Sequence, residues 1–227
     1  MEMAAIGATD AGGCNRLALT DEDRRARDLF IHWCAAEHCA VRVDQMGNIF
    51  ARREGTQAGL PPIISGSHLD TQRTGGRFDG VYGVLAAVEV IRTLNDLKIG
   101  TRHPVEAVVW SNEEGARFSP AMIGSGTWAG AYDLDFGHSR TDTDGVRFDE
   151  ALRHIGYLGD HPCVASSVKA AFEVHIEQGP LLEAAGNTIG VLTGIQGVRW
   201  YEIVIDGKSS HAGTTPMDTR RDQVVAL

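Results

Sequence analysis

Five residues of types that bind metal ions or transfer protons lie on three short segments of this chain: His68, Asp70, Asp79, Glu113 and Glu114. The first two end the apolar run PPIISGSHLDT, the third lies in the glycine-rich loop GGRFDGVYG, and the last two follow the apolar run VEAVVW. In open α/β sheets, the loops that leave the carboxyl ends of neighbouring strands meet at one edge. We therefore expect these side chains to converge on a metal site.

The residue types indicate which chemistry such a site would perform. Imidazoles and carboxylates suit Zn, Mn, Co or Ni, and one carboxylate can bridge two such ions roughly 3.5–4 Å apart. Asp79 is the candidate bridge, and the spacing of His68 and Asp70 predicts a ligand steadied by a carboxylate. Of Glu113 and Glu114, one could hold metal while the other acts as general base.

Each segment alone has an ordinary structural explanation. A histidine at a strand end is usually a hydrogen-bonded structural residue, two adjacent glutamates are usually solvated, and Phe-Asp-Gly is usually a turn. The combination is stronger evidence, because two charges at the end of a buried strand cost stability unless cations balance them.

Hydrophobic periodicity predicts the elements that position these residues. Helices are expected within 21–39, capped by Thr20, and over 81–97. Strands are expected near 41–44, 48–54, 61–71 and 105–115, and from 170 to a strand end at His175 and Glu177. This alternation predicts an α/β fold with a mixed, mostly parallel sheet flanked by helices.

The remaining segments carry weaker signals. The polar stretch 133–162 reads as a surface excursion with one helical patch at 148–155. Two β-stretches are expected around 194–197, and a helix is expected to begin near Asp218. Six histidines match no motif and are assigned surface or packing roles: His32, His38, His103, His138, His154 and His161.

Composition narrows the class of partner. With 21 basic and 30 acidic side chains, the net charge of -9 disfavours nucleic acids and anionic membranes, so a small-molecule substrate is expected. There is no apolar run of about 18 residues and no secretory signal, so we expect a cytoplasmic protein. The four cysteines form no CxxC pair and are expected to be reduced.

Four ordered segments carry a family resemblance: GSHLDTQRTGGRFDGVYGVLAAVEVI, WSNEEGARFSPAMIGSGTWAG, HIEQGPLLE and GIQGVRWYEIVIDGKSSHAGTTPMDTRRD. They resemble the hydantoinase/carbamoylase amidohydrolases, a group of N-carbamoyl-L-amino acid hydrolases, β-ureidopropionases and allantoate amidohydrolases related to dinuclear aminoacylases. The resemblance implies that residues 1–194 are the N-terminal portion of a metal-dependent, zinc-exopeptidase-like catalytic domain. It also implies the start of a smaller α+β lid and dimerisation domain over 195–227.

The resemblance also implies individual roles. His68 and His175 would hold the first of two divalent ions (Zn, or Mn, Co or Ni), Asp79 would bridge, and Glu114 would hold the second. Among the catalytic residues, Glu113 would be the general base beside Asp70. Gln178 would contact substrate, and His211 would bind it and polarise the scissile carbonyl from the partner subunit of a homodimer.

The activity implied is hydrolysis of the ureido C–N bond of an N-carbamoyl-L-amino acid to amino acid, ammonia and carbon dioxide. Allantoate and dinuclear aminoacylase-type peptidase activities are the alternatives of the same chemistry. A catalytically incomplete fragment is a further alternative, because members of the family are longer than this chain. The missing part would hold the remaining histidine ligand and the arginine and asparagine that bind the substrate carboxylate.

Overall fold

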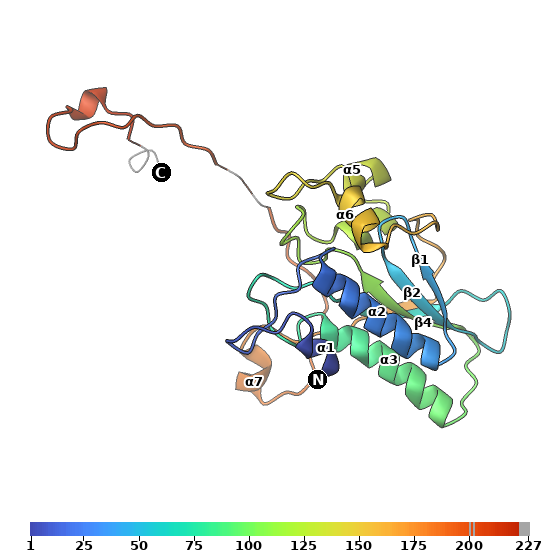
Figure 1. Ribbon diagram of the computed structural model, residues 1–227. Coiled ribbons are helices and arrows are strands. Elements are labelled where there is room, and N and C mark those ends of the chain that lie inside the picture. Colours follow the sequence, from blue (N-terminus) through green and yellow to red (C-terminus); the bar gives the residue numbers. More distant parts are fainter. Residues whose placement is uncertain (200, 202, 223–227) are drawn as a thin grey trace. The chain divides into compact units, whose positions relative to one another are not determined.

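A computed structural model describes residues 1–199, 201 and 203–222 (Figure 1). Contacts divide the chain into two units, Met1–Gln178 and Gly179–Leu227. The first unit contains the whole sheet and the helices that cover it. The catalytic and lid domain boundary expected after residue 194 stays a prediction.

The sheet has five strands in the order β1-β2-β4-β3-β5. Their bounds are β1 Ala40–Val43, β2 Ile49–Arg53, β3 Ile63–His68, β4 Val105–Trp110 and β5 Ala170–Phe172. The β1–β2 and β2–β4 pairs are antiparallel, whereas the β3–β4 and β3–β5 pairs are parallel. The expected mixed α/β sheet is therefore confirmed, and its parallel half contains the strands that lead to the predicted metal ligands.

Helices α2 (Asp21–Ala36) and α3 (Val81–Asp96) cover the same face of the sheet, as Figure 1 shows. The Thr20 hydroxyl caps α2 by accepting from the Asp23 amide at 3.4 Å, which satisfies a donor at the helix start. Both predicted helices are confirmed, each ending slightly earlier than expected. Their apolar sides pack on alternate strand residues in the main core: Phe30, Val84, Val88, Ile91, Ile49, Ala51, Ala107 and Val109.

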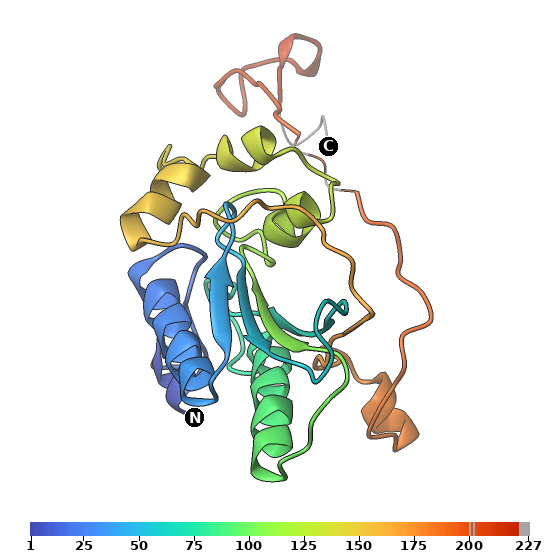
Figure 2. The same ribbon diagram turned by 90° about the vertical axis from the view of Figure 1, so that its right-hand side faces the viewer.

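The opposite face of the sheet has a smaller apolar cluster and a buried charge. Trp110 and Trp128, with ring centroids 5.3 Å apart and a tilt of 53°, pack against a cluster of Phe50, Ile64 and Val108. On the same face, Glu106 is 2% exposed and accepts from Arg42 and Arg52 at 3.0 Å each. The chain after residue 160 crosses this side on its way to β5 (Figure 2).

The polar stretch 133–162 is more than a surface excursion. It contains α5 (Leu134–His138) and α6 (Phe148–Ile155), and α6 matches the predicted patch. Phe148 and Leu152 are fully buried in the main core. The polar composition concealed an apolar stripe at i, i+3, i+4 and i+7 on this helix.

Three further expectations differ from the structure. The last strand ends at Phe172, well before His175, and the next residue, Glu173, accepts a hydrogen bond from the Ser67 hydroxyl through its side chain. No strand is present among the described residues of 188–222, where the two β-stretches were expected. Positions 200 and 202 of those stretches lie outside the described residues.

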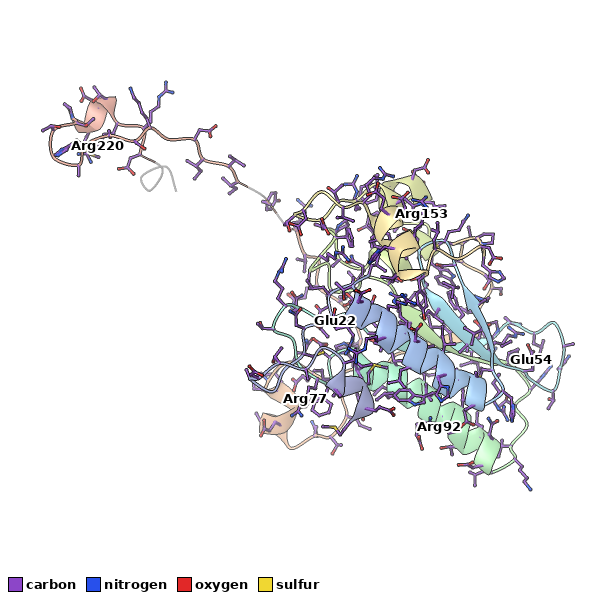
Figure 3. The ribbon with its side chains drawn as sticks, in the orientation of Figure 1. Glu22, Glu54, Arg77, Arg92, Arg153 and Arg220 are labelled. Carbon is purple, nitrogen blue, oxygen red and sulfur yellow. The ribbon has the colours of Figure 1, made fainter. Side chains whose placement is uncertain are left out.

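The second unit has short helical elements only, in the part that the structure describes. These are α7 (Leu181–Ala185) and the 3₁₀ turn η1 (Met217–Thr219), close to the helix start expected near Asp218. The continuation of that helix over 223–227 lies outside the described residues. Arg220, labelled in Figure 3, donates to the Thr215 carbonyl at 2.8 Å and closes the turn.

Two short elements complete the fold, α1 (Glu2–Ala5) at the N-terminus and α4 (Ile123–Trp128) after the glutamate pair. None of the helices in the described residues is long and apolar enough to cross a membrane. All four cysteines are free and buried.

Candidate metal centre

Three parallel strands deliver the candidate residues to one edge of the sheet. His68, the last residue of β3, pairs in register with Trp110, the last residue of β4. On the other side of β3, Ser65 pairs with Phe172, the last residue of β5. The loops that follow these strands therefore leave the sheet at the same edge, and Arg77 in Figure 3 marks the loop between β3 and α3.

Ligand atoms of His68, Asp79 and His175 all lie within 4.8 Å of one another. The Nδ1 of His68 donates to the Asp70 carbonyl at 2.8 Å, and the Nδ1 of His175 donates to the Ile176 carbonyl at 2.9 Å. A carbonyl only accepts, so both rings carry a proton on Nδ1, and in the neutral ring the lone pair is then on Nε2. This is the tautomer that an Nε2 metal ligand requires.

Asp79 lies between the second histidine and a glutamine. Its Oδ1 is 3.3 Å from His175 Nε2, and its Oδ2 accepts from Gln178 Nε2 at 2.6 Å. The following residue, Gly80, has a φ of +65°, and a Cβ there would collide with the His68 ring. Glycine is thus required for the backbone of this loop to pass beneath the imidazole.

Asp70 acts on a different partner from the one that the sequence predicted. Its carboxylate oxygen is 3.9 Å from His68 Nδ1, too far for a hydrogen bond, and the ring is held by the Asp70 carbonyl instead. The carboxylate accepts from the amides of Glu113 and Glu114 at 3.2 Å each. Burial raises the pKa of Asp70 to about 6 against the opposing charge of His68.

The two glutamates have different surroundings. Glu113 Oε2 is 3.3 Å from His68 Nε2. Burial raises the pKa of Glu113, with His68 opposing and Glu114 reinforcing the shift. Burial disfavours the charged form of His68, but the carboxylates of Asp70 and Glu113 outweigh it and raise its pKa.

Glu114 has one satisfied and one unsatisfied oxygen. Its Oε2 accepts from Gln72 Nε2 at 2.8 Å, while Oε1 is buried without a hydrogen-bond partner among the described residues. A buried carboxylate oxygen with no donor is costly in a folded protein and fits a cation ligand. The two imidazoles and Asp79 form a donor set suited to a divalent transition metal, and Glu114 lies outside this three-residue cluster.

His211 belongs to the second unit. Its Nδ1 accepts from the amides of Gly213 and Thr214 at 3.1 and 3.2 Å. The proton is therefore on Nε2, which leaves this ring with a free donor.

Two residues that support the site were missed in the sequence. Gln72 donates to Glu114, and Glu173 accepts from the hydroxyl of Ser67, the residue before His68. Each is two residues from a residue that was identified, Asp70 and His175 respectively. The alternation of side chains in extended backbone is the signal that could have found them.

Comparisons with known proteins agree with this fold. The model of Peptidase family M20/M25/M40 matches residues 64–223, and the chain belongs to that family. It is 49% identical over its whole length to an N-carbamoyl-L-amino-acid amidohydrolase of Rhizobium meliloti, covering 55% of that protein. It is 38% identical over 99% of its length to an allantoate amidohydrolase of Escherichia coli, again covering 55%.

Solved structures give the same result. A hydantoinase/carbamoylase family amidase from Burkholderia vietnamiensis has a TM-score of 0.95 and 58% identity, over 99% of this chain and 55% of that one. The resemblance to hydantoinase/carbamoylase amidohydrolases is therefore confirmed. The chain spans about half the length of the relatives it matches.

Proposed function

We propose that this chain forms the metal-binding part of an amidohydrolase that cleaves the ureido C–N bond of an N-carbamoyl-L-amino acid. The observation that carries the proposal is the convergence of His68, Asp79 and His175 within 4.8 Å, with both imidazoles oriented by backbone carbonyls. The names of the N-carbamoyl-L-amino-acid amidohydrolases among the relatives support this substrate class.

In the proposed mechanism, His68 and His175 would hold one divalent cation, Asp79 would be shared with a second, and Glu114 would contribute its unpartnered Oε1 to the second. Zinc is our first candidate, with manganese, cobalt or nickel as alternatives. When bound, such cations supply Lewis acidity, which lowers the pKa of water and polarises the ureido carbonyl.

The protein supplies the proton transfers and the orientation. Glu113 takes a proton from the attacking water and returns it to the leaving nitrogen, and its raised pKa suits both steps. Asp70 holds the turn that carries Glu113 through two backbone amides. The C–N bond breaks to give a carbamate that loses carbon dioxide, so the products are amino acid, ammonia and carbon dioxide.

Gln178 and His211 are proposed to bind substrate. The Nε2–H of His211 would donate to the scissile carbonyl from the partner subunit of a cytoplasmic homodimer. Gln178 holds Asp79 in the present structure, so substrate or metal would have to compete for its amide. Its backbone φ of 54° is unusual for a residue with a side chain, as is found at functional positions.

A substrate panel tests the proposal. Ammonia release is measured from N-carbamoyl-L-amino acids and allantoate, and amine release from N-acetyl-amino acids and dipeptides, with Zn²⁺, Mn²⁺ or Co²⁺ and after chelation. We expect turnover of carbamoyl substrates that stops on chelation and in Glu113→Gln, with metal still bound by that variant. Undiminished hydrolysis after chelation would reject the mechanism.

A second candidate is a catalytically incomplete fragment that binds metal without turnover. The chain's coverage of 55% of its relatives favours it. Metal binding with no turnover of any panel member would support this candidate, and turnover of allantoate, acyl or peptidyl substrates alone would assign one of the related activities instead.

A further inference from the structure

We propose that residues Cys14–Leu19, here called the strap, position the two loops of the metal centre through Arg16. The inference rests on the proposed function, because the site it controls is the cluster of His68, Asp79 and His175 with the neighbouring pair Glu113 and Glu114. Arg16 touches no candidate ligand side chain and is a positioning residue.

Arg16 is an unusual buried cation. It is 1% exposed, and among the described residues no carboxylate forms an ion pair with it. Its guanidinium instead donates to backbone carbonyls, at 2.6 Å to Leu69 and 2.7 Å to Ile6. A buried arginine without a counter-ion is costly, and here the hydrogen bonds that offset the cost hold main chain in place.

The strongest of these bonds reaches the peptide between two site residues. Leu69 separates His68 from Asp70, and its carbonyl accepts from Arg16 Nε. The Arg16 amide donates to Thr71 Oγ1 at 2.8 Å, and the Arg16 carbonyl accepts from the Thr71 amide at 2.9 Å. Arg16 thus fixes the chain on both sides of Asp70.

The strap also closes the far end of the first loop. The amides and carbonyls of Cys14 and Gly75 exchange two hydrogen bonds, at 2.9 and 3.0 Å. The loop that leaves β3 is therefore paired with the strap over most of its path towards Asp79. A β-like pairing of this kind restricts a segment that has no regular structure of its own.

The other end of the strap contacts the second loop. Arg117, three residues after Glu114, donates to the carbonyls of Ala18 and Leu19 at 3.0 and 2.6 Å. One short segment therefore joins the loop carrying His68 and Asp70 to the loop carrying Glu113 and Glu114. Because a metal centre tolerates small errors in ligand placement poorly, this connection should set its affinity.

The test is the affinity of the chain for Co²⁺, titrated by its visible absorption at a temperature where every variant is folded by circular dichroism. Arg16→Lys keeps the charge but loses the fork of donors. We expect it to weaken Co²⁺ binding by about tenfold and to shift the absorption bands, as loss of a ligand-orienting partner does.

Arg53→Lys is the matched control. Arg53 also donates to a backbone carbonyl, that of Ile99 at 2.7 Å, and to Asn95 at 2.7 Å, but at the opposite edge of the sheet. We expect its Co²⁺ affinity to stay within about twofold of the parent chain. Equal affinities for the two variants would overturn the proposal and leave Arg16 with a structural role only.

Two further measurements keep the outcomes distinct. If Arg16→Lys does not fold, Thr71→Val removes the acceptor of the Arg16 amide with little change of shape, and unchanged Co²⁺ affinity in that variant overturns the proposal.

If the parent chain binds no Co²⁺, the proposed metal function fails. Hydrogen exchange of the Glu113 and Glu114 amides then tests whether Arg16 positions their loop. Faster exchange in Arg16→Lys than in Arg53→Lys supports the proposal, and equal exchange contradicts it.

Discussion

Strand β4 and the loop after it carry three glutamates whose surroundings differ. Glu106, within the strand, is buried and accepts from two arginines. Glu113 and Glu114, beyond the strand end, are partly buried, and one oxygen of Glu114 has no partner in the described part of the chain. Burial of a carboxylate therefore does not by itself indicate function. A buried carboxylate oxygen that lacks a hydrogen-bond donor, on a loop close to two imidazoles, is a better indication.

The largest expected effect is on metal binding at the candidate site. The variant His68→Ala removes one of the two imidazole nitrogens proposed to bind metal. It should weaken Co²⁺ binding by more than about 100-fold, a larger loss than removal of an orienting residue causes. Isothermal calorimetry measures the change. His103→Ala is the control, because that ring binds the Pro61 carbonyl at the opposite edge of the sheet, and a similar loss there would contradict the assignment.

The variant Glu106→Ala tests whether the strand glutamate contributes to stability and not to metal binding. This variant leaves Arg42 and Arg52 without their shared acceptor and should reduce the free energy of unfolding by about 2 kcal/mol. The value lies below that for a fully buried pair because both arginines are about a third exposed, at 32% and 28%. Urea unfolding measures the loss, and Co²⁺ affinity should not change at a temperature where the variant is folded.

Glu114→Gln makes the comparison sharper, because stability and metal affinity should move in opposite directions. Removing the charge of a poorly compensated carboxylate should raise the free energy of metal-free unfolding by about 0.5–1 kcal/mol. It should also weaken Co²⁺ binding by about tenfold. A variant that is less stable without metal would show that Glu114 is compensated like Glu106.

The smallest effect concerns Asp142, a compensated carboxylate outside the site. Burial opposes its ionisation, but the Val146 amide and Arg117, with the Asp144 amide, outweigh that and lower its pKa. The contribution of this carboxylate to the free energy of unfolding is therefore complete above its pKa in the unfolded chain, about 3.9. It is lost as the pH falls through the lower pKa of the folded state. The free energy of unfolding of Asp142→Asn should be about 1 kcal/mol lower than that of the parent chain at neutral pH.

The pH profile of urea unfolding checks this sign. The difference between Asp142→Asn and the parent chain should shrink as the pH drops below about 4. A constant difference across that range would mean that the carboxylate charge contributes nothing.

Much of this arrangement is predictable from sequence, for reasons that particular residues illustrate. Thr20 and the apolar spacing of 81–97 predicted both large helices, because capping and periodicity are local signals. The apolar runs before His68 and Glu113 predicted neighbouring strand ends. The β5 end was misplaced because the length of a strand depends on its pairing with β3, a partner about a hundred residues away that has no local signal in the sequence.

The site shows the same division. The spacing of His68 and Asp70 predicted that they act together but not which atoms meet, since the carbonyl rather than the carboxylate of Asp70 holds the ring. Arg16 carries no local signal, as its partners at Leu69 and Thr71 are more than fifty residues away. The roles of Gln178 and His211 stay predictions.

The backbone bonds to both imidazoles have a consequence for how a cation is taken up and released. With each Nδ1 proton tied to a carbonyl, the only basic atom left on either ring is the one that faces Asp79 or Glu113. Hydrogen ions and metal ions must then compete for that same atom. Mild acid should accordingly empty such a centre while the surrounding sheet remains folded, and returning to neutral pH should refill it without any rotation of the rings.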